Sequence, residues 1–256
     1  MRKDKDYFLE RAYPNMEDRT TFLEHIVRYR FALDFVKGKV VLDDACGTGY
    51  GTAILSKKAK KAIGIDASDK AIKLSKKGFH GNNLGFEQMD STKLRFKDNS
   101  FDVVCSFETI EHIKNQELFL KEAARVLKKD GILIISTPNK EFFKKINSKP
   151  NPFHKKELSF DEFDGLLAKF FVNMGFFGQK NLKMSGSLRH EKLIKLVSVL
   201  DIFGLRMIFR KSVRDEVRKK ATCVIGGSVP EEITLKDIKI TKNLDDAQYF
   251  IAVCIK

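Results

Sequence analysis

The sequence predicts an α/β fold in which helices flank a mostly parallel sheet. Two observations indicate this fold. Short apolar segments alternate along the chain with segments whose apolar residues recur at helical spacing. The first apolar segment, at 40–44, also runs through acidic residues into a glycine-rich bend, VVLDDACGTGYG, before another helical stretch. The length of 256 residues is ample for one such domain.

The predicted elements follow one another in the order that a parallel sheet requires. A helix at 21–36 belongs to an N-terminal cap segment, 1–36, and further helices are expected at 50–61, 115–128 and 160–170. Seven strands are expected, near 40–44, 62–66, 84–88, 101–106, 131–137, 171–179 and 248–255. The chain is therefore interpreted as a single domain, 1–256, with an insertion at 180–247 between the last two strands. The insertion would serve as a lid or bind the acceptor.

The glycine-rich bend is the strongest chemical signal in the chain. Its glycines at 47, 49 and 51 permit positive φ and a close approach of the backbone to a ligand. The following helix would direct free N–H groups and the positive end of its dipole over the bend. The dinucleotide-binding pattern needs glycine or alanine three residues after Gly49, where Thr52 stands, so NAD is disfavoured. The bend predicts a site for a nucleotide or an amino-acid carboxylate.

Acidic residues follow the next strands of the predicted sheet. Asp66 ends the second strand, close to the spacing at which an acid reaches a ribose hydroxyl, and Asp90 follows the third. The carboxyl ends of parallel strands meet at one edge of a sheet. We therefore expect these acids and the bend to flank one crevice.

Several motifs in fixed order resemble the class I S-adenosylmethionine-dependent methyltransferases. They are VLDDACGTGYG, AIGIDAS, the acid in QMDST, RFKDNSFDVVCSFETIEHI and RVLKKDGILIISTPN. The resemblance covers about residues 25–180 and resumes at the last strand. It implies a Rossmann-like, seven-stranded methyltransferase sheet whose last strand is antiparallel. Two residues depart from the family pattern: Ala45 replaces the commoner glycine, and Asp44 stands where an aliphatic residue is usual.

The resemblance implies S-adenosylmethionine as the cofactor and gives its contacts. Residues after the first strand surround the methionine end, Asp66 takes the ribose hydroxyls and Asp90 the adenine amino group. The ammonium, diol and amine of such a ligand do require separated acceptors. The full set of expected cofactor residues is Tyr29, which could instead pack in the core, Asp43, Ala45, Gly47, Gly49, Asp66, Ala67, Met89, Asp90, Ser91, Ser106 and Phe107.

The acceptor side offers three candidate catalytic residues. His112, just past the fourth strand, has an ordinary pKa that suits a general base, and Glu108 is its neighbour. His154 lies in NPFHKKELS, which resembles an element of methyltransferases associated with glycan and cell-surface polysaccharide pathways. Both histidines have a structural alternative, since each could instead hold its loop by hydrogen bonding.

These observations favour O-methylation of a sugar, a glycan-linked metabolite or another small-molecule acceptor, with S-adenosylhomocysteine as product. One alternative is a methyltransferase of quinone precursors or other metabolites, which the ISTPN and EHI elements also resemble. Another is an RNA-binding or regulatory protein that retains the cofactor pocket. The motifs of DNA amino- and cytosine C5-methyltransferases are absent from the sequence, so DNA modification is disfavoured.

Composition sets further limits on partners and location. The formal net charge of +14 is compatible with an anionic acceptor, nucleic acid or peripheral membrane contact, but lysines spread over the chain are usually just solvated. Nucleic acid is therefore not favoured. The sequence has neither a membrane-spanning apolar run nor a signal peptide, which predicts a cytoplasmic protein. It carries no signal of an oligomeric state.

The cysteines and histidines show no metal-binding pattern. The cysteines at 46, 105, 223 and 254 have no close pairing, and buried thiols are expected rather than disulfides or zinc ligands. The histidines include no HxxxH pair. No metal site is predicted from the sequence.

Overall fold

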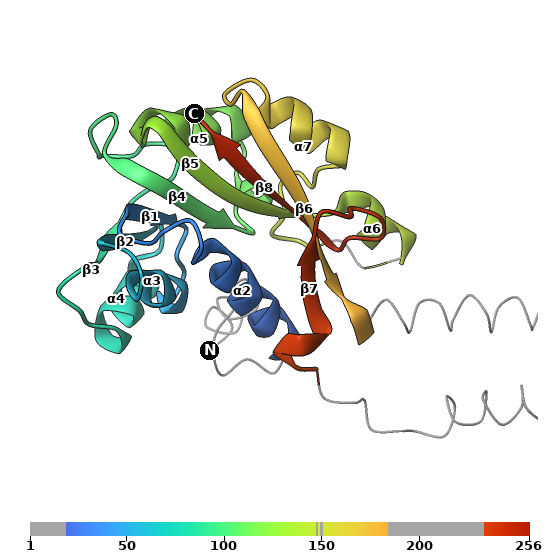
Figure 1. Cartoon of the computed structure of the whole chain (residues 1–256), viewed down its shortest axis with the longest axis horizontal. Coiled ribbons are helices and arrows are strands. Elements are labelled where there is room, and N and C mark those ends of the chain that lie inside the picture. Colours follow the sequence, from blue (N-terminus) through green and yellow to red (C-terminus); the bar gives the residue numbers. More distant parts are fainter. Residues whose placement is uncertain (1–18, 147, 149–150, 184–232) are drawn as a thin grey trace, which may run out of the picture. The chain divides into compact units, whose positions relative to one another are not determined.

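The computed structural model describes residues 19–146, 148, 151–183 and 233–256. Its strands are β1 (Val40–Asp44), β2 (Lys61–Asp66), β3 (Leu84–Gln88), β4 (Phe101–Phe107), β5 (Leu127–Pro138), β6 (Asn173–Asn181), β7 (Ile238–Thr241) and β8 (Tyr249–Ile255) (Figure 1). Its helices are α2 (Arg19–Ala32), α3 (Tyr50–Ser56), α4 (Asp69–Gly78), α5 (Gln116–Val126), α6 (Lys140–Lys145) and α7 (Phe160–Leu167), with short 3₁₀ turns η1 (Ile110–His112) and η3 (Leu235–Asp237).

The strands form one sheet in the order β3-β2-β1-β4-β5-β8-β6-β7. The first five strands in this order are parallel, and β8 runs antiparallel to both β5 and β6. The predicted α/β class and the antiparallel last strand are confirmed. The eighth strand, β7, was not expected, because four residues reading IKIT give too short an apolar pattern. From the centre of the sheet, the strands β1, β2 and β3 follow one another toward one edge, and β4 and β5 follow toward the other. A crevice forms where the order reverses, at the carboxyl ends of β1 and β4.

Helices cover both faces of this sheet, and alternating strand residues supply the two cores. On one face, α5 and α7 bury Phe119, Leu120 and Phe163 against Leu42 and Val104. On the other face, α2 and α3 pack Tyr29 and Leu55 against the neighbouring strand positions, Val41 and Val103 (Figure 1). The sheet is therefore the rigid scaffold from which the loops at its carboxyl edge project.

The junction between α5 and β5 differs from the one that the sequence predicted. Helix α5 ends at Val126, and β5 begins immediately with Leu127, which pairs with Phe101 ahead of an irregularity in the β4–β5 register. Asp130 then adopts a left-handed conformation with φ 60° within the strand. The helix is therefore shorter than the expected 115–128, and Lys129-Asp130-Gly131 lies in a strand that begins before the expected residue 131.

The chain divides into two compact units, residues 1–180 with 238–256, and residues 181–237. In the second unit, the described residues include η3, where the Asp237 carboxylate accepts hydrogen bonds from the backbone and hydroxyl of Thr234. Residues 184–232 of the predicted insertion and residues 1–18 of the predicted cap segment lie outside the described residues. No helix within the described part of the chain has both the length and the apolar character to cross a membrane.

Two adjacent carboxylates are buried at the end of β1. Asp43 is 0% exposed and accepts hydrogen bonds from Thr52 Oγ1 at 2.6 Å and from the Tyr29 hydroxyl at 3.1 Å. Asp44 is 1% exposed and accepts from the Ser91 hydroxyl. Burial raises the pKa of each aspartate to about 7, because the charged form loses its hydration, although these hydrogen bonds partly offset the effect.

The contact of Tyr29 with Asp43 depends on a glycine in the first turn of α3. A Cβ atom on Gly51 would overlap the ring of Tyr29, so only glycine lets α2 approach α3 this closely. We predict that Gly51→Ala lowers the free energy of unfolding by about 1–3 kcal/mol, as overpacked cores do. Chemical denaturation measures this loss. The matched substitution Gly165→Ala, on the exposed side of α7 where a Cβ meets nothing, should instead add about 0.5–1 kcal/mol; equal effects at both sites would contradict the packing argument.

The buried aspartates also predict how stability depends on pH. Their pKa values rise from about 3.9 in the unfolded chain to about 7 when folded, so the folded state binds protons more tightly. Their contribution is therefore fully present below about pH 4 and is lost as the pH rises to about 7. Denaturation of the protein without added ligand should show this decline, and Asp44→Asn should reduce it. The exposed Asp34→Asn should keep the native slope, and an Asp44→Asn profile parallel to the native one would contradict the assignment.

Candidate functional site

A cavity of about 1350 Å³ opens at the carboxyl ends of β1, β2, β4 and β5. A pocket for a single small molecule has roughly 300–1,000 Å³, so this cavity has room for two substrates. The predicted site residues that line it are Tyr29, Ala45, Gly47, Asp66, Ala67, Asp90, Ser91, Phe107, Glu108, His112 and His154. The structure thus brings together most of the residues that the sequence analysis selected.

The glycine-rich bend forms the floor of the cavity. Gly47 has φ 56°, and nothing lies within 4 Å of the position that a Cβ would take, so its backbone is open toward the cavity. Ala45 has φ 62°, a left-handed conformation that favours glycine. This conformation explains why the related family commonly has glycine there. The bend therefore presents backbone, rather than side chains, to a ligand.

Acidic groups from neighbouring strands stand around the bend. Asp66, at the end of β2, accepts hydrogen bonds from the backbone N–H groups of Gly47 and Ser68 at 3.1 and 2.8 Å. These bonds fix the carboxylate against the bend. Asp90 is exposed, and its Oδ1 accepts from the backbone and hydroxyl of Thr92, both at 2.7 Å. Both carboxylates line the same wall of the cavity.

Four predicted cofactor residues do not line the cavity and lie behind its wall. Asp43 is buried beneath Tyr29, and the hydroxyl of Ser106 donates to the carbonyl of Asp44. Gly49 has φ 86°, and a Cβ there would meet Ser75 at 2.7 Å. Met89 is 2% exposed and belongs to the core. These residues shape the wall without reaching the cavity.

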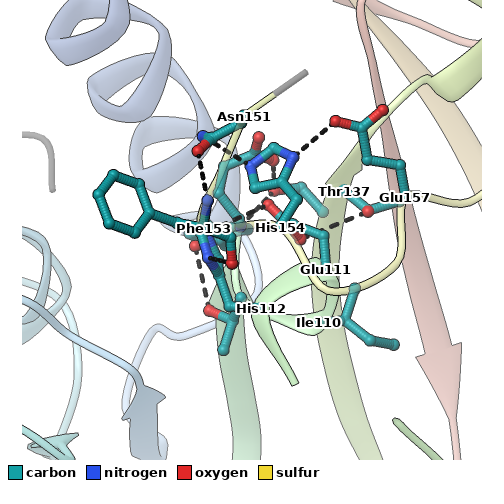
Figure 2. Close-up of polar contacts among 12 residues, drawn as sticks. Ile110, Glu111, His112, Thr137, Asn151, Phe153, His154 and Glu157 are labelled. Atoms are coloured by element: carbon teal, nitrogen blue, oxygen red, sulfur yellow. Dashed lines mark hydrogen bonds and ion pairs between the residues drawn. The ribbon is translucent and has the colours of Figure 1, made fainter. Parts of the chain in front are cut away.

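Two histidines from separate segments also line the cavity. His112 closes η1 after β4, and its Nδ1 donates to the carbonyl of Phe153 at 3.2 Å. His154 lies in the loop before α7, and Figure 2 shows its ring between Asn151 and Glu157. The two imidazole rings meet edge to face with centroids 4.9 Å apart. The structure therefore pairs the two catalytic candidates.

Glu111 is buried next to these histidines. Its side chain is 0% exposed, and its Oε1 lies 4.0 Å from Nε2 of His112. Burial, and then the charge of Glu108, raise the pKa of Glu111 well above its ordinary value. Its backbone carbonyl accepts from the N–H groups of Lys155 and Lys156, which ties the histidine-bearing loop to η1.

A buried arginine organises the wall near Glu108. Arg28 is 0% exposed; its Nη1 donates to Gln179 at 3.0 Å and lies 3.8 Å from the Glu108 carboxylate. Its guanidinium also stacks 4.6 Å above the ring of Tyr249. Glu108 itself has φ 53°, and Ser136 donates a 2.6 Å hydrogen bond to its carboxylate. The third catalytic candidate is thus held in a constrained position beside the histidines.

Several cavity residues escaped the sequence analysis. Thr21 and His25 line the cavity with Tyr29, and their spacing of four residues could have marked this face of α2. Burial, and then the charge of Arg28, lower the pKa of His25 well below its ordinary value. Tyr249 also lines the cavity, but it comes from β8, and no local pattern connects it with the bend.

The cysteines within the described residues follow the expectation from the sequence. Cys46, Cys105 and Cys254 are buried free thiols. Burial raises the pKa of Cys254 to about 12, which leaves this thiol protonated and inert at neutral pH. Cys223 lies outside the described residues.

The chain is similar to several known methyltransferases. Residues 42–135 match a family described as Methyltransferase domain. A Mycobacterium tuberculosis (strain ATCC 25618 / H37Rv) protein, described as a probable S-adenosylmethionine-dependent methyltransferase, is 34% identical over 169 residues, covering 65% of this chain and 60% of that protein. The ubiquinone biosynthesis O-methyltransferase of Pelagibacter ubique (strain HTCC1062) is 34% identical over 106 residues, covering 41% of this chain and 44% of the enzyme. The chain thus spans less than two thirds of these relatives.

A solved structure from Thermotoga maritima shares the fold. It is described as an S-adenosylmethionine-dependent methyltransferase, possible histamine N-methyltransferase, and matches with a TM-score of 0.62 at 17% identity, covering 100% of this chain and 95% of that one. The matched family segment contains the bend, Asp66, Asp90 and the η1 turn, which together line part of the cavity. With this sheet order and this cavity wall, residues 42–135 are a methyltransferase domain with the class I fold.

Proposed function

We propose that this protein is an S-adenosylmethionine-dependent methyltransferase that methylates a hydroxyl group of a sugar, a glycan-linked metabolite or a similar small molecule. The observation that carries the proposal is the cavity, which joins an acid-lined backbone floor to a wall with paired histidines. The M. tuberculosis and P. ubique relatives, by their descriptions, support the donor and the class of reaction.

The floor of the cavity fits the proposed donor. Open backbone at Gly47 suits a close approach of the ligand, and the carboxylate of Asp66 suits a ribose diol. Asp90, Ala67 and Ser91 lie on the same wall and suit an adenine group. When bound, the donor supplies a methyl group on a positively charged sulfur, which acidic surroundings favour.

The histidine wall suits an acceptor that must lose a proton. Nδ1 of His112 donates to the Phe153 carbonyl, so Nε2 carries the lone pair in the neutral ring. An imidazole with this tautomer, lining the cavity, can assist removal of a hydroxyl proton. His154 is aligned by Glu157 through a 2.6 Å hydrogen bond, and Glu108 stands on the same side.

The polar character of this wall favours a hydroxyl-rich acceptor. Asn151, Ser148 and Lys144 line the cavity with the histidines, and the aromatic rings of Phe143 and Tyr249 complete it. Amide, hydroxyl and ammonium groups suit the hydroxyl groups of a sugar, and aromatic rings suit its apolar face. A quinone precursor is the second candidate, supported by the ubiquinone biosynthesis relative and the same aromatic rings.

We predict that Asp66→Ala weakens the binding of S-adenosylmethionine about 10–100-fold, because the two ribose hydroxyls lose the charged carboxylate that accepts their hydrogen bonds. Isothermal titration calorimetry measures the change, and circular dichroism checks that the fold is kept. The control Asp69→Ala removes an exposed carboxylate at the start of α4, outside the cavity, and should bind as the native protein does. Absent binding by the native protein, or native affinity in Asp66→Ala, would refute the donor site.

We predict that His112→Ala lowers the rate of methyl transfer about 10²–10⁴-fold and changes donor affinity less than about twofold, because the histidine faces the acceptor. Transfer of a labelled methyl group into nucleotide sugars, polysaccharide extracts and quinone precursors measures the rate and identifies the acceptor class. His80→Ala, an exposed histidine outside the cavity, should keep full activity. Unchanged turnover in His112→Ala would remove this residue from the reaction, and transfer confined to quinone precursors would favour the second candidate.

A further inference from the structure

Glu111, His112 and His154 form a cluster on the acceptor side of the cavity. Each offers one nitrogen or oxygen atom, and these three atoms lie within 4.8 Å of one another. All three residues line the cavity. The cluster joins η1 to the loop before α7, two segments that α5, β5 and α6 separate along the chain (Figure 2).

Both histidines are oriented as metal-ligating histidines are. His112 donates from Nδ1 to the Phe153 carbonyl, and His154 Nδ1 lies 2.6 Å from the Glu157 carboxylate. A bond of this kind fixes the ring and its tautomer and leaves the Nε2 lone pair for coordination. Asn151 Nδ2 now lies 3.0 Å from Nε2 of His154, a contact that a bound cation would replace.

The carboxylate of Glu111 provides an independent indication of a ligand. Its Oε2 accepts a long hydrogen bond from Thr137, at 3.4 Å, and its Oε1 is buried without a hydrogen-bond partner among the described residues. A buried oxygen without a partner is costly. This oxygen faces Nε2 of His112, at 4.0 Å. A cation between the carboxylate and the two rings would satisfy it.

We propose that Glu111, His112 and His154 bind one divalent transition-metal ion, for which Zn²⁺ is the best match. Two imidazoles and one carboxylate are a donor set that Zn²⁺ uses in catalytic sites, with a further position open. Ligand bonds of about 2.1 Å allow donor atoms to lie up to roughly 4.2 Å apart. Small side-chain rotations therefore suffice to close the present spacing around the ion.

The role of the ion rests on the proposed function. The open coordination position would face the cavity, where an acceptor hydroxyl could bind. A coordinated hydroxyl has a lowered pKa, so its proton passes to solvent water and the oxygen stays on the ion as an alkoxide. His112 would then assist the acceptor through the metal instead of taking the proton itself.

Calorimetric titration of the full chain, freed of metal by chelation and of any affinity tag, with ZnCl₂ tests the site. The native protein should bind one Zn²⁺ per chain, whereas His112→Ala and His154→Ala should each weaken binding at least about 100-fold. Glu157→Gln, which disturbs only the orientation of His154, should weaken it about 10–100-fold. Glu111→Gln would remove the third ligand, but this residue is buried. Glu157→Gln keeps the test decisive if Glu111→Gln does not fold.

His80→Ala is the matched control, because it removes an exposed histidine from the loop after α4 and should bind Zn²⁺ as the native protein does. Absence of saturable binding by the native protein, or native affinity in both His112→Ala and His154→Ala, would overturn the proposal. Asp66→Ala separates it from the donor site: this variant should lose S-adenosylmethionine and keep Zn²⁺. Zn²⁺ binding by a native protein that does not bind S-adenosylmethionine would refute the proposed function and leave the metal site standing.

Discussion

The burial of Asp43 at the end of β1 is the interaction on which the glycine-rich side of the cavity depends. A carboxylate withdrawn from water needs compensating hydrogen bonds, and here Thr52 and Tyr29 supply them. These partners come from α3 and α2, so one buried group ties both helices to the central strand. The Tyr29 ring then covers Gly51 and forms part of the cavity wall. The hydrogen bonds to the buried carboxylate of Asp43 therefore help to position the bend.

The two walls of the cavity are held by different means. The floor and the acidic wall project directly from the ends of β1 and β2, so the sheet register fixes their spacing. The histidine wall instead consists of η1 and a loop, joined by hydrogen bonds from Lys155 and Lys156 to the Glu111 carbonyl and from Gln116 to the carbonyls of Ile110 and Lys156. A wall fixed by the sheet beside a wall held by loop hydrogen bonds allows the histidine wall to vary while the sheet stays the same.

Most of the fold could be predicted because its signals are local. The alternation of apolar strands with helical segments gave the α/β class, and the acids after the strands marked the edge of the sheet where the cavity lies. The strand β7 escaped prediction because four residues carry too little periodicity, and β5 began earlier than expected because the helix passed directly into the strand. Met89 and Gly49 were placed near a ligand by their motif, whereas side-chain packing put both behind the wall.

By itself, the sequence determined the sheet-forming pattern, the glycine-rich bend and the acids that accompany it, because these depend on residues a few positions apart. It also identified His112 and His154 separately. Only the tertiary structure decided that these histidines meet and that Glu111 lies beside them with a buried oxygen lacking a hydrogen bond. It alone also decided that Arg28 stacks on Tyr249, which lines the same cavity. The reason is physical: convergence of side chains from η1, the loop before α7, α2 and β8 depends on how the helices pack on the sheet, and no local spacing encodes that packing.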